Sequence, residues 1–385
     1  MGLTGRATPA GTARYAAHLL AGAGNGAREP EHGGPPVVVE HFRTALGLTL
    51  SSIGCGTYLG DVSDAADERY LSALTEAVTC GCNVLDTAVN YRAQRSEIAL
   101  GRAIAVLVNS GASARDELLV ASKGGFVAYR LGRPADPAQY VYDNFIATGL
   151  ARPEDLAGGI HCMAPDYLSQ QIIWSLRNLG LHTLDVYYIH NPEAQLAFVD
   201  RATFRKRLQL AFARLEEEVA AGRIGCYGVA TWEGLRRPPM SADYLSLEIM
   251  VGLAAEIAGP GHHFRFVQFP FSAAMPNAAS FRNQPVTGSL MTPLDAARSL
   301  GLAVVTSASI MQGRLLGRLP KALAAAFPGL EGDAQRALQL ARSMPGVTTA
   351  LVGMGRKEHA RQNLALAALP PDPDEARRLA HALAR

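Results

Sequence analysis

Short apolar runs rich in β-branched residues alternate with longer amphipathic segments from about Val37 to the end of the chain. A short apolar run predicts a buried strand, whereas apolar residues recurring every three or four positions predict a helix. Strands are predicted at residues 51–56, 82–86, 118–122, 184–190, 225–230, 264–269, 302–306 and 348–352. Helices are predicted at residues 68–79, 96–107, 165–178, 208–221, 242–256, 293–299, 333–343 and 357–367, with a last one near 373–383.

The order of these elements predicts the fold class. Strands that alternate with helices form parallel sheets with right-handed crossovers, and continuously apolar strands indicate that both sheet faces are buried. Eight such units fit an α/β fold, a (β/α)8 TIM barrel, as one domain over residues 37–385. The alternative is an open doubly wound sheet, which usually carries a Gly-x-Gly-x-x-Gly turn after its first strand. Gly54-Cys55-Gly56 does not continue into that motif, so we favour the barrel.

One connection, residues 126–164 after the third strand, is unusually long. Segments of this length without predicted elements are uncommon and are often functional or disordered. This one contains Tyr129, Tyr140, Tyr142 and Phe145, and its aromatic content argues against disorder. Because it follows a barrel strand, it lies on the rim where barrel enzymes carry their active sites. We expect this long loop to form a wall or lid over a substrate site.

Composition narrows the class of partner. The chain has 385 residues, 48% of them hydrophobic, which is enough to bury a large core. Its formal net charge is only +2, and no basic stripe is interleaved with aromatic residues, so nucleic acid is excluded as the expected partner. No uninterrupted apolar run approaches the ~20 residues that span a bilayer, so no membrane is expected either.

The first 36 residues differ from the rest. They are rich in Gly, Ala and Pro and contain no acidic residue before Glu29. This composition predicts a disordered N-terminal tail over residues 1–36. An organelle transit peptide has a similar composition and is the less favoured alternative.

The cysteines predict a reducing compartment. Their number is odd, no Cys-x-x-Cys pair occurs, and no Cys/His cluster has the spacing of a zinc site. We therefore expect no disulfide framework, no metal and a cytoplasmic location. The five residues are Cys55, Cys80, Cys82, Cys162 and Cys226.

Four proton-handling residues lie at or just past the ends of three successive predicted strands. Asp86 ends the second strand, Tyr91 follows it by five residues, Lys123 follows the third strand, and His190 ends the fourth. A charged group next to a buried strand is costly unless it is paired, and an ammonium favours ionisation of a nearby phenol. Each residue alone would more often be structural. All four at one barrel rim indicate an active site.

These residues carry a resemblance to a known family. Asp86-Thr87-Ala88-Val89-Asn90-Tyr91 resembles the Asp-Thr-Ala-x-x-Tyr signature of the aldo-keto reductases. Lys123 resembles the lysine of the family's third strand and His190 the histidine of its fourth. The resemblance extends from Leu46 to about Leu366.

The resemblance implies roles for these residues. Tyr91 would protonate the carbonyl oxygen during reduction, Lys123 and Asp86 would lower the Tyr91 pKa, and His190 would orient the carbonyl. Hydride would pass directly to or from a nicotinamide, whose chemistry belongs to the cofactor. The implied function is oxidation and reduction between an alcohol and an aldehyde, ketone or sugar.

The resemblance also implies a cofactor site. Gln268 matches the glutamine that holds the nicotinamide carboxamide, Thr231 stands where the family has the second residue of Ser-Asn, and Ser307 stands where an aromatic residue usually stacks on the nicotinamide. A helix N-terminus with added cations suits a phosphate, so Arg356 favours NADPH (NADP) over NADH. The other residues implied are Gln312, Gly313, Arg314, Gly353, Gly355, His359, Gln362 and Asn363.

Two alternative functions stay open at this point. Lys123 at the end of a barrel strand could form a Schiff base, as in an aldolase. The altered residue at Ser307 would also fit a non-catalytic NADP(H)-binding subunit that senses redox state. Retention of Tyr91 and Lys123 favours the oxidoreductase.

Overall fold

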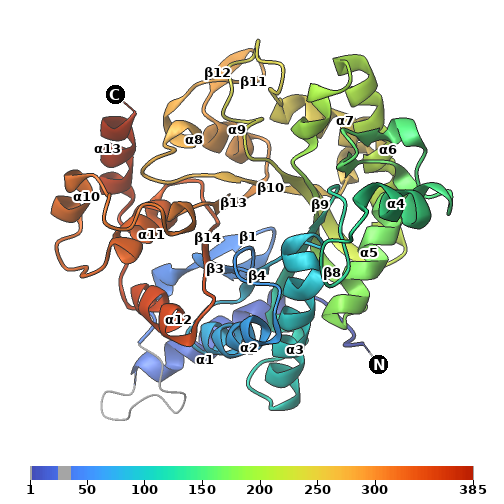
Figure 1. The fold of residues 1–385 in the computed structure, drawn as a ribbon. Coiled ribbons are helices and arrows are strands. Elements are labelled where there is room, and N and C mark those ends of the chain that lie inside the picture. Colours follow the sequence, from blue (N-terminus) through green and yellow to red (C-terminus); the bar gives the residue numbers. More distant parts are fainter. Residues whose placement is uncertain (1, 25–35, 385) are drawn as a thin grey trace.

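The computed structural model describes residues 2–24 and 36–384, and its centre is a closed barrel (Figure 1). Every neighbouring pair in the barrel is parallel, so the carboxyl ends of all its strands meet at one rim. The predicted (β/α)8 barrel is confirmed, and the open doubly wound sheet is ruled out. The strands are β3 (Ile53–Gly56), β4 (Val84–Asp86), β5 (Leu119–Gly124), β8 (Leu184–His190), β9 (Ile224–Ala230), β10 (Phe264–Pro270), β13 (Ala303–Ser307) and β14 (Thr349–Gly353).

Helices form the outer layer around the barrel (Figure 1). Two of them begin where a side chain caps the helix rather than where the apolar pattern begins. Asp200 accepts from Thr203 N, so α6 begins earlier than predicted, and Ser246 accepts from Ile249 N, so α7 begins later. The longer helices are α2 (Asp64–Thr79), α3 (Arg95–Asn109), α5 (Pro165–Leu179), α6 (Arg201–Ala220), α7 (Leu247–Ala258), α9 (Pro293–Ser299), α11 (Asp333–Ser343), α12 (Lys357–Leu364) and α13 (Pro373–Leu383), and the shorter ones are α8 (Asn277–Ser280) and α10 (Lys321–Ala326).

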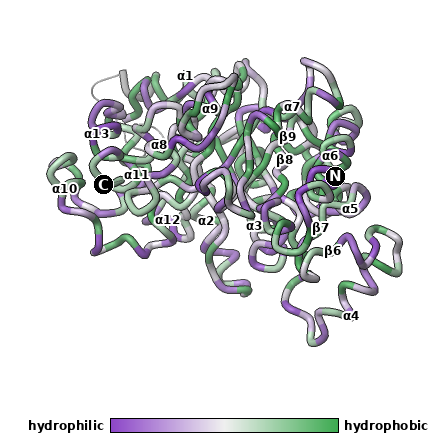
Figure 2. Tube along the Cα trace, turned by 90° about the horizontal axis from the view of Figure 1, so that it is seen from above, coloured by the Kyte–Doolittle hydropathy of each residue, from purple (hydrophilic) through white to green (hydrophobic). Residues whose placement is uncertain are grey.

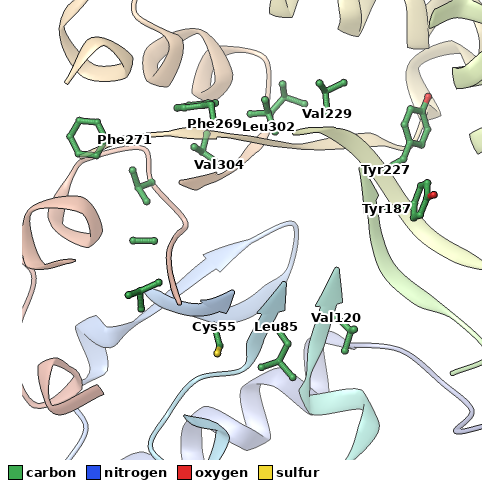
Figure 3. Packing of buried hydrophobic residues seen from close by; sticks show 14 of the residues in the cluster. Cys55, Leu85, Val120, Tyr187, Tyr227, Val229, Phe269, Phe271, Leu302 and Val304 are labelled. Atoms are coloured by element: carbon green, nitrogen blue, oxygen red, sulfur yellow. The ribbon is translucent and has the colours of Figure 1, made fainter. Parts of the chain in front are cut away.

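The core has two layers because successive side chains of a strand point to opposite faces. Leu85, Val120 and Val229 point away from the barrel centre toward the helices (Figure 3). Alternate residues such as Val84, Leu119 and Val186 fill the barrel interior. Continuous apolar strands therefore serve both layers, as their sequences predicted.

The described N-terminal residues are folded, which corrects the predicted disordered tail. Leu3 forms a parallel bridge with Leu181, and α1 (Pro9–Gly24) packs beside a hairpin of β1 (Phe42–Ala45) and β2 (Leu48–Ser51). Residues 25–35 of the predicted tail lie outside the described residues.

Specific contacts hold α1 in place. The Tyr15 ring is buried, and its hydroxyl donates to Val78 O. Arg14 pairs with Asp116 at 2.6 Å and Glu117 at 2.9 Å. The small residues that resembled a flexible tail allow close approach instead: a Cβ on Gly11 would lie 2.2 Å from the carbonyl oxygen of Asp116.

The connection 126–164 is structured rather than a simple loop. It contains α4 (Pro137–Val141), a turn of π-helix (Tyr142–Ile146), and the two-stranded pair of β6 (Leu156–Ala157) and β7 (His161–Cys162). Figure 2 shows α4 projecting beyond the body of the barrel. Phe145 is buried, with its ring centroid 4.9 Å from that of Tyr167 on α5. Phe145 thus anchors this segment on α5.

Two features differ from the predicted pattern, one outside the barrel and one within it. A second hairpin of β11 (Gln284–Val286) and β12 (Ser289–Met291) precedes α9. Lys123 lies inside β5 and not after it, because β5 continues to Gly124. The lysine therefore projects from a strand at a fixed register opposite Tyr188 of β8.

The described residues can be compared with the expectations about disulfides, metal sites and membrane spans. All five cysteines are free, and burial raises the pKa of Cys82 and Cys226 to about 12. Within residues 2–24 and 36–384, no group of three or more His, Cys, Asp or Glu could hold a metal ion. In the same residues, no helix combines the length and the apolar character needed to cross a membrane.

Candidate active site

A cavity of about 480 Å³ opens at the carboxyl ends of the barrel strands. Asp86, Tyr91 and His190 all line it, as expected from their positions at one rim. Its other walls include Gly56, Thr57, Tyr58, Leu59, Asn90, Phe126, Asn191, Thr231, Trp232, Gln268, Ser307, Ile310, Gln312 and Gly353.

Asp86 and Lys123 form a buried ion pair at the base of this cavity. The Lys123 ammonium is fully buried, donates to the Asp86 carboxylate, and donates to Thr87 O at 2.9 Å. Burial lowers the pKa of Lys123, and the neighbouring Asp86 opposes that shift. Such a pair is costly to separate, because removing one partner strands the other charge.

Tyr91 lies over this ion pair. The Lys123 ammonium is 4.9 Å from the centroid of the Tyr91 ring, and the hydroxyl of Tyr91 forms no hydrogen bond with the described residues. Burial raises the pKa of Tyr91 well above its usual value, and Asp86 adds to this shift. Asp86 therefore raises the Tyr91 pKa, contrary to expectation, whereas the lowering expected from Lys123 stays a prediction. Tyr91 holds its proton at neutral pH, and it can donate that proton.

A strained turn fixes the position of Tyr91. The next three residues, Arg92, Ala93 and Gln94, all have positive φ, which residues other than glycine adopt at a cost of roughly 1–3 kcal/mol each. Arg92 secures the turn, donating to Asp61 O at 2.8 Å and pairing with Asp67 at 2.5 Å.

His190 faces Tyr91 across the cavity. The two ring centroids are 5.7 Å apart in an edge-on arrangement. Burial lowers the pKa of His190 well below its usual value, and the positive charge of Lys123 adds to this. His190 is therefore a neutral imidazole at pH 7, able to donate a hydrogen bond from one ring nitrogen to a carbonyl oxygen.

Gln268 connects the proton-handling residues to the predicted cofactor side. It lies on β10 opposite Ala230 of β9, and its Nε2 donates to Asp86 Oδ2 at 2.8 Å. The other amide atom, Oε1, is left for a ligand. This hydrogen bond fixes the side chain of Gln268 over the floor of the cavity.

The predicted cofactor residues fall into two groups. Thr231, Ser307, Gln312 and Gly353 line the cavity, as does Gln268. The rest lie outside the cavity walls, in the loop before α10, at the N-terminal end of α12 and in its last turn. They are Gly313 and Arg314 in the loop, Gly355, Arg356 and His359 at the N-terminal end, and Gln362 and Asn363 in the last turn.

The hydroxyl of Thr231 is already engaged. It donates to Glu193 Oε1 at 2.6 Å and accepts from Gly234 N at 3.0 Å. Glu193 Oε1 also accepts from Trp232 N at 2.8 Å. Thr231 therefore organises the loop after β9, and its hydroxyl has no second proton to offer a carboxamide.

The N-terminal end of α12 presents one unpaired cation. Lys357 pairs with Glu76 of α2 at 3.1 Å, and Arg361 pairs with the same carboxylate, so Glu76 offsets one of these two positive charges. Arg356, the residue before α12, is exposed, and its side chain forms no ion pair or hydrogen bond with the described residues. Arg356 is therefore the cation that is available to an anion at the N-terminal end of α12.

The sequence did not single out four residues around the cavity. Tyr58, Phe126 and Trp232 are aromatic wall residues, and Glu193 is the buried acceptor behind Trp232. Each follows a barrel strand closely, and this position in the sequence is the feature that could have identified them as residues near the active site. Of the long segment 126–164, only Phe126 lines the cavity, and the four aromatic residues expected to form a lid do not.

Comparisons with known proteins agree with this geometry. The sequence model of the Aldo/keto reductase family matches residues 52–237. A relative described as NADH-specific methylglyoxal reductase, from Escherichia coli (strain K12), is 26% identical over 190 residues. That match covers 48% of this chain and 49% of the relative, so the chain spans about half the length of the curated relative it matches.

Solved structures extend the likeness to the whole barrel. An aldo/keto reductase from Klebsiella pneumoniae in complex with NADP and acetate has a TM-score of 0.59 at 20% identity, covering 89% of this chain and 94% of that one. An aldo-keto reductase from Bacillus halodurans in its holo form has a TM-score of 0.60 at 18% identity, covering 89% and 96%. The family resemblance seen in the sequence is confirmed: residues 52–237 match the sequence model of the aldo/keto reductase family, and the chain has the barrel fold of the family's solved members.

Proposed function

We propose that this protein is a nicotinamide-dependent oxidoreductase that interconverts a carbonyl compound and its alcohol, with Tyr91 as the proton donor. The observation that carries the proposal is the position of Tyr91, which lines the cavity with its ring centroid 4.9 Å from the Lys123 ammonium and 5.7 Å from that of His190. The match of residues 52–237 to the aldo/keto reductase family supports the same reaction class.

The residues suit a reduction at neutral pH. Tyr91 carries its proton, and the Lys123 charge behind the ring stabilises the phenolate that remains after donation. The paired Asp86 keeps Lys123 charged despite its burial. His190 fixes the carbonyl oxygen by a hydrogen bond within reach of Tyr91. The same steps in reverse remove the alcohol proton during oxidation.

The cavity fits a nicotinamide cofactor. It extends from Tyr91 to Gly353 at the end of β14, where nothing lies within 4 Å of the position a Cβ would occupy. Gln268 would hold the carboxamide through Oε1, and Gln312 and Gly353 would border the phosphates. When bound, the nicotinamide supplies or accepts the hydride.

The exposed Arg356 favours NADPH over NADH, because it offers an unpaired charge to an added phosphate at the N-terminal end of α12. The relative from Escherichia coli is described as NADH-specific, and the Klebsiella pneumoniae structure contains NADP. Cofactor preference is therefore proposed from the residues of this chain.

The Schiff-base aldolase is not favoured. Lys123 is fully buried, is bonded to Asp86 and Thr87, and does not line the cavity. A carbonyl carbon in the cavity would meet the Tyr91 ring before the lysine nitrogen. A redox-sensing subunit would bind the nicotinamide cofactor but, unlike an oxidoreductase, would turn over no carbonyl or alcohol.

The proposed function is tested by nicotinamide absorbance with purified protein, NADPH or NADH, and a panel of aldehydes, ketones and aldoses. We expect carbonyl-dependent oxidation of NADPH. Binding of NADPH without turnover of any carbonyl or alcohol would instead support the redox-sensing subunit. Trapping of a carbonyl on Lys123 by borohydride would support the aldolase.

A further inference from the structure

Resting on the proposed function, we infer that the substrate is an uncharged carbonyl compound with a flat apolar body, and that Trp232 is the residue that selects it. The inference narrows the broad class of aldehydes, ketones and sugars expected from the sequence. It depends on the walls of the cavity around the carbonyl position.

Aromatic rings surround that position on several sides. The Tyr58 ring lies edge-on to Tyr91 with centroids 4.9 Å apart, and Phe126 lies edge-on to His190 at 5.2 Å. Trp232 lines the cavity from the loop after β9, and it is 36% exposed, so much of its indole is free for contact. Flat apolar groups gain both burial and ring contacts in such surroundings.

The same walls carry no free charge. Among the described residues, no lysine, arginine or glutamate lines the cavity, and Asp86 is already bonded to Lys123 and Gln268. Asn90 and Asn191 are neutral amides. A carboxylate or phosphate on the substrate would therefore exchange its hydration for neutral hydrogen-bond donors with no cation to pair with it, which is costly. The many hydroxyl groups of a sugar would likewise face aromatic rings.

Glu193 positions Trp232. Its Oε1 accepts from Trp232 N at 2.8 Å, from Glu233 N at 3.0 Å and from the Thr231 hydroxyl at 2.6 Å. Glu193 is only 7% exposed and does not line the cavity, so it acts on the substrate through Trp232. Bonds to a buried carboxylate are among the stronger hydrogen bonds in proteins.

The first experiment compares a neutral ester with its free carboxylate, which differ in charge and in one methyl group. We expect kcat/KM for methyl 4-formylbenzoate to exceed that for 4-formylbenzoate at least tenfold. Aldoses such as xylose should fall below the ester by a similar factor. Equal or better use of the charged aldehyde or of xylose would overturn the inference while leaving the oxidoreductase proposal intact.

The second experiment tests Trp232. Trp232→Leu should lower kcat/KM for the ester at least fivefold more than for methylglyoxal, which has no ring to contact the indole. Trp174 on α5 packs against Phe145 outside the cavity, so Trp174→Phe provides the matched control and should not change this ratio. An unchanged ratio in Trp232→Leu would remove Trp232 as the selecting residue.

The third experiment reads binding without turnover. The chain has two tryptophans, so in Trp174→Phe the emission comes from Trp232. The alcohol product of the ester should quench or shift this emission, and the product with a free carboxylate should not at equal concentration. Discrimination without any turnover would contradict the proposed function and support the inference. Turnover without discrimination would support the proposed function and contradict the inference.

The role of Glu193 has its own readout. Glu193→Ala in the Trp174→Phe background should shift the emission maximum of Trp232 in the ligand-free protein and raise KM for the ester more than it changes kcat. Glu193→Gln retains an acceptor oxygen and should restore part of both effects. If the emission maximum and the KM stay unchanged in Glu193→Ala, Glu193 does not position Trp232.

Discussion

The Nε2 atom of Gln268 donates a hydrogen bond of 2.8 Å to Oδ2 of Asp86. The two residues lie 182 positions apart, on β10 and β4. Asp86 also holds the Lys123 ammonium beneath Tyr91. The residue expected to grip the nicotinamide and the residues expected to move the proton thus form one buried network.

Gln268→Leu should therefore impair both cofactor binding and proton transfer. A hydrogen bond to a charged group contributes about 1.5–3 kcal/mol, so its loss should lower kcat roughly tenfold or more and weaken cofactor binding. Steady-state kinetics with a cofactor titration measures both effects. Gln139→Leu, at an exposed position on α4, is the matched control. If the variant binds the cofactor weakly but keeps its full kcat, the network does not link the two functions.

Arg356→Ala should weaken NADPH binding about tenfold and leave NADH binding nearly unchanged. The reason is that Arg356 is exposed and has no partner among the described residues, whereas Lys357 is paired with Glu76 at 3.1 Å. Lys357→Ala should accordingly have the smaller effect. Dissociation constants from fluorescence titration give the comparison. Equal losses for NADPH and NADH would show that Arg356 does not contact the added phosphate.

His161 should make the fold sensitive to acid. It is buried behind the site, its Nε2 donates to His190 O at 2.8 Å, and its Nδ1 accepts from Gln195 at 3.0 Å. Burial lowers the pKa of His161 to about 4, while the unfolded chain protonates near 6.5. The unfolded state therefore binds the extra proton between these pH values. The free energy of unfolding should fall by roughly 3 kcal/mol from this residue as pH drops from 6.5 to 4, and it should be constant above 6.5.

Urea unfolding of the wild type and His161→Gln at several pH values measures this contribution. From pH 7 to pH 4, the free energy of unfolding of the wild type should fall by roughly 3 kcal/mol more than that of His161→Gln. His381→Gln, at an exposed position on α13, provides the control. Parallel pH profiles for the wild type and His161→Gln would rule out this role.

Gly11→Ala should destabilise the fold, because the added Cβ would lie 2.2 Å from the backbone oxygen of Asp116. We expect a loss of about 1–3 kcal/mol in the free energy of unfolding. Gly252→Ala in α7 meets nothing within 4 Å and should instead stabilise by about 0.5–1 kcal/mol. Thermal unfolding distinguishes the two variants, because Tm should fall in Gly11→Ala and rise in Gly252→Ala. A neutral Gly11→Ala would mean that α1 does not pack against Asp116.

The barrel was predictable from the sequence because its signal is repeated along the chain. Continuous apolar strands such as β8 (Leu184–His190) carry the signal in their own residues. Asp86 and His190 could be placed at the rim because they end strands, and Tyr91 followed from its motif.

Other features depend on contacts between distant residues. The segment around Tyr15 resembled a flexible tail, because a Gly- and Ala-rich composition does not reveal a surface that those small residues fit. The raised pKa of Tyr91 follows from burial, which the spacing of charged residues does not specify. The engagement of Thr231 by Glu193 joins positions 38 residues apart and has no local pattern.

The most direct test of the account is Tyr91→Phe, which removes one hydroxyl and keeps the ring over Lys123. General acid catalysis contributes about 10²–10⁴-fold, so carbonyl reduction should fall by at least about 100-fold while NADPH binding is retained. Tyr142→Phe, at an exposed tyrosine outside the cavity, should retain full turnover. Turnover by Tyr91→Phe at the wild-type rate would contradict the central claim that Tyr91 supplies the proton.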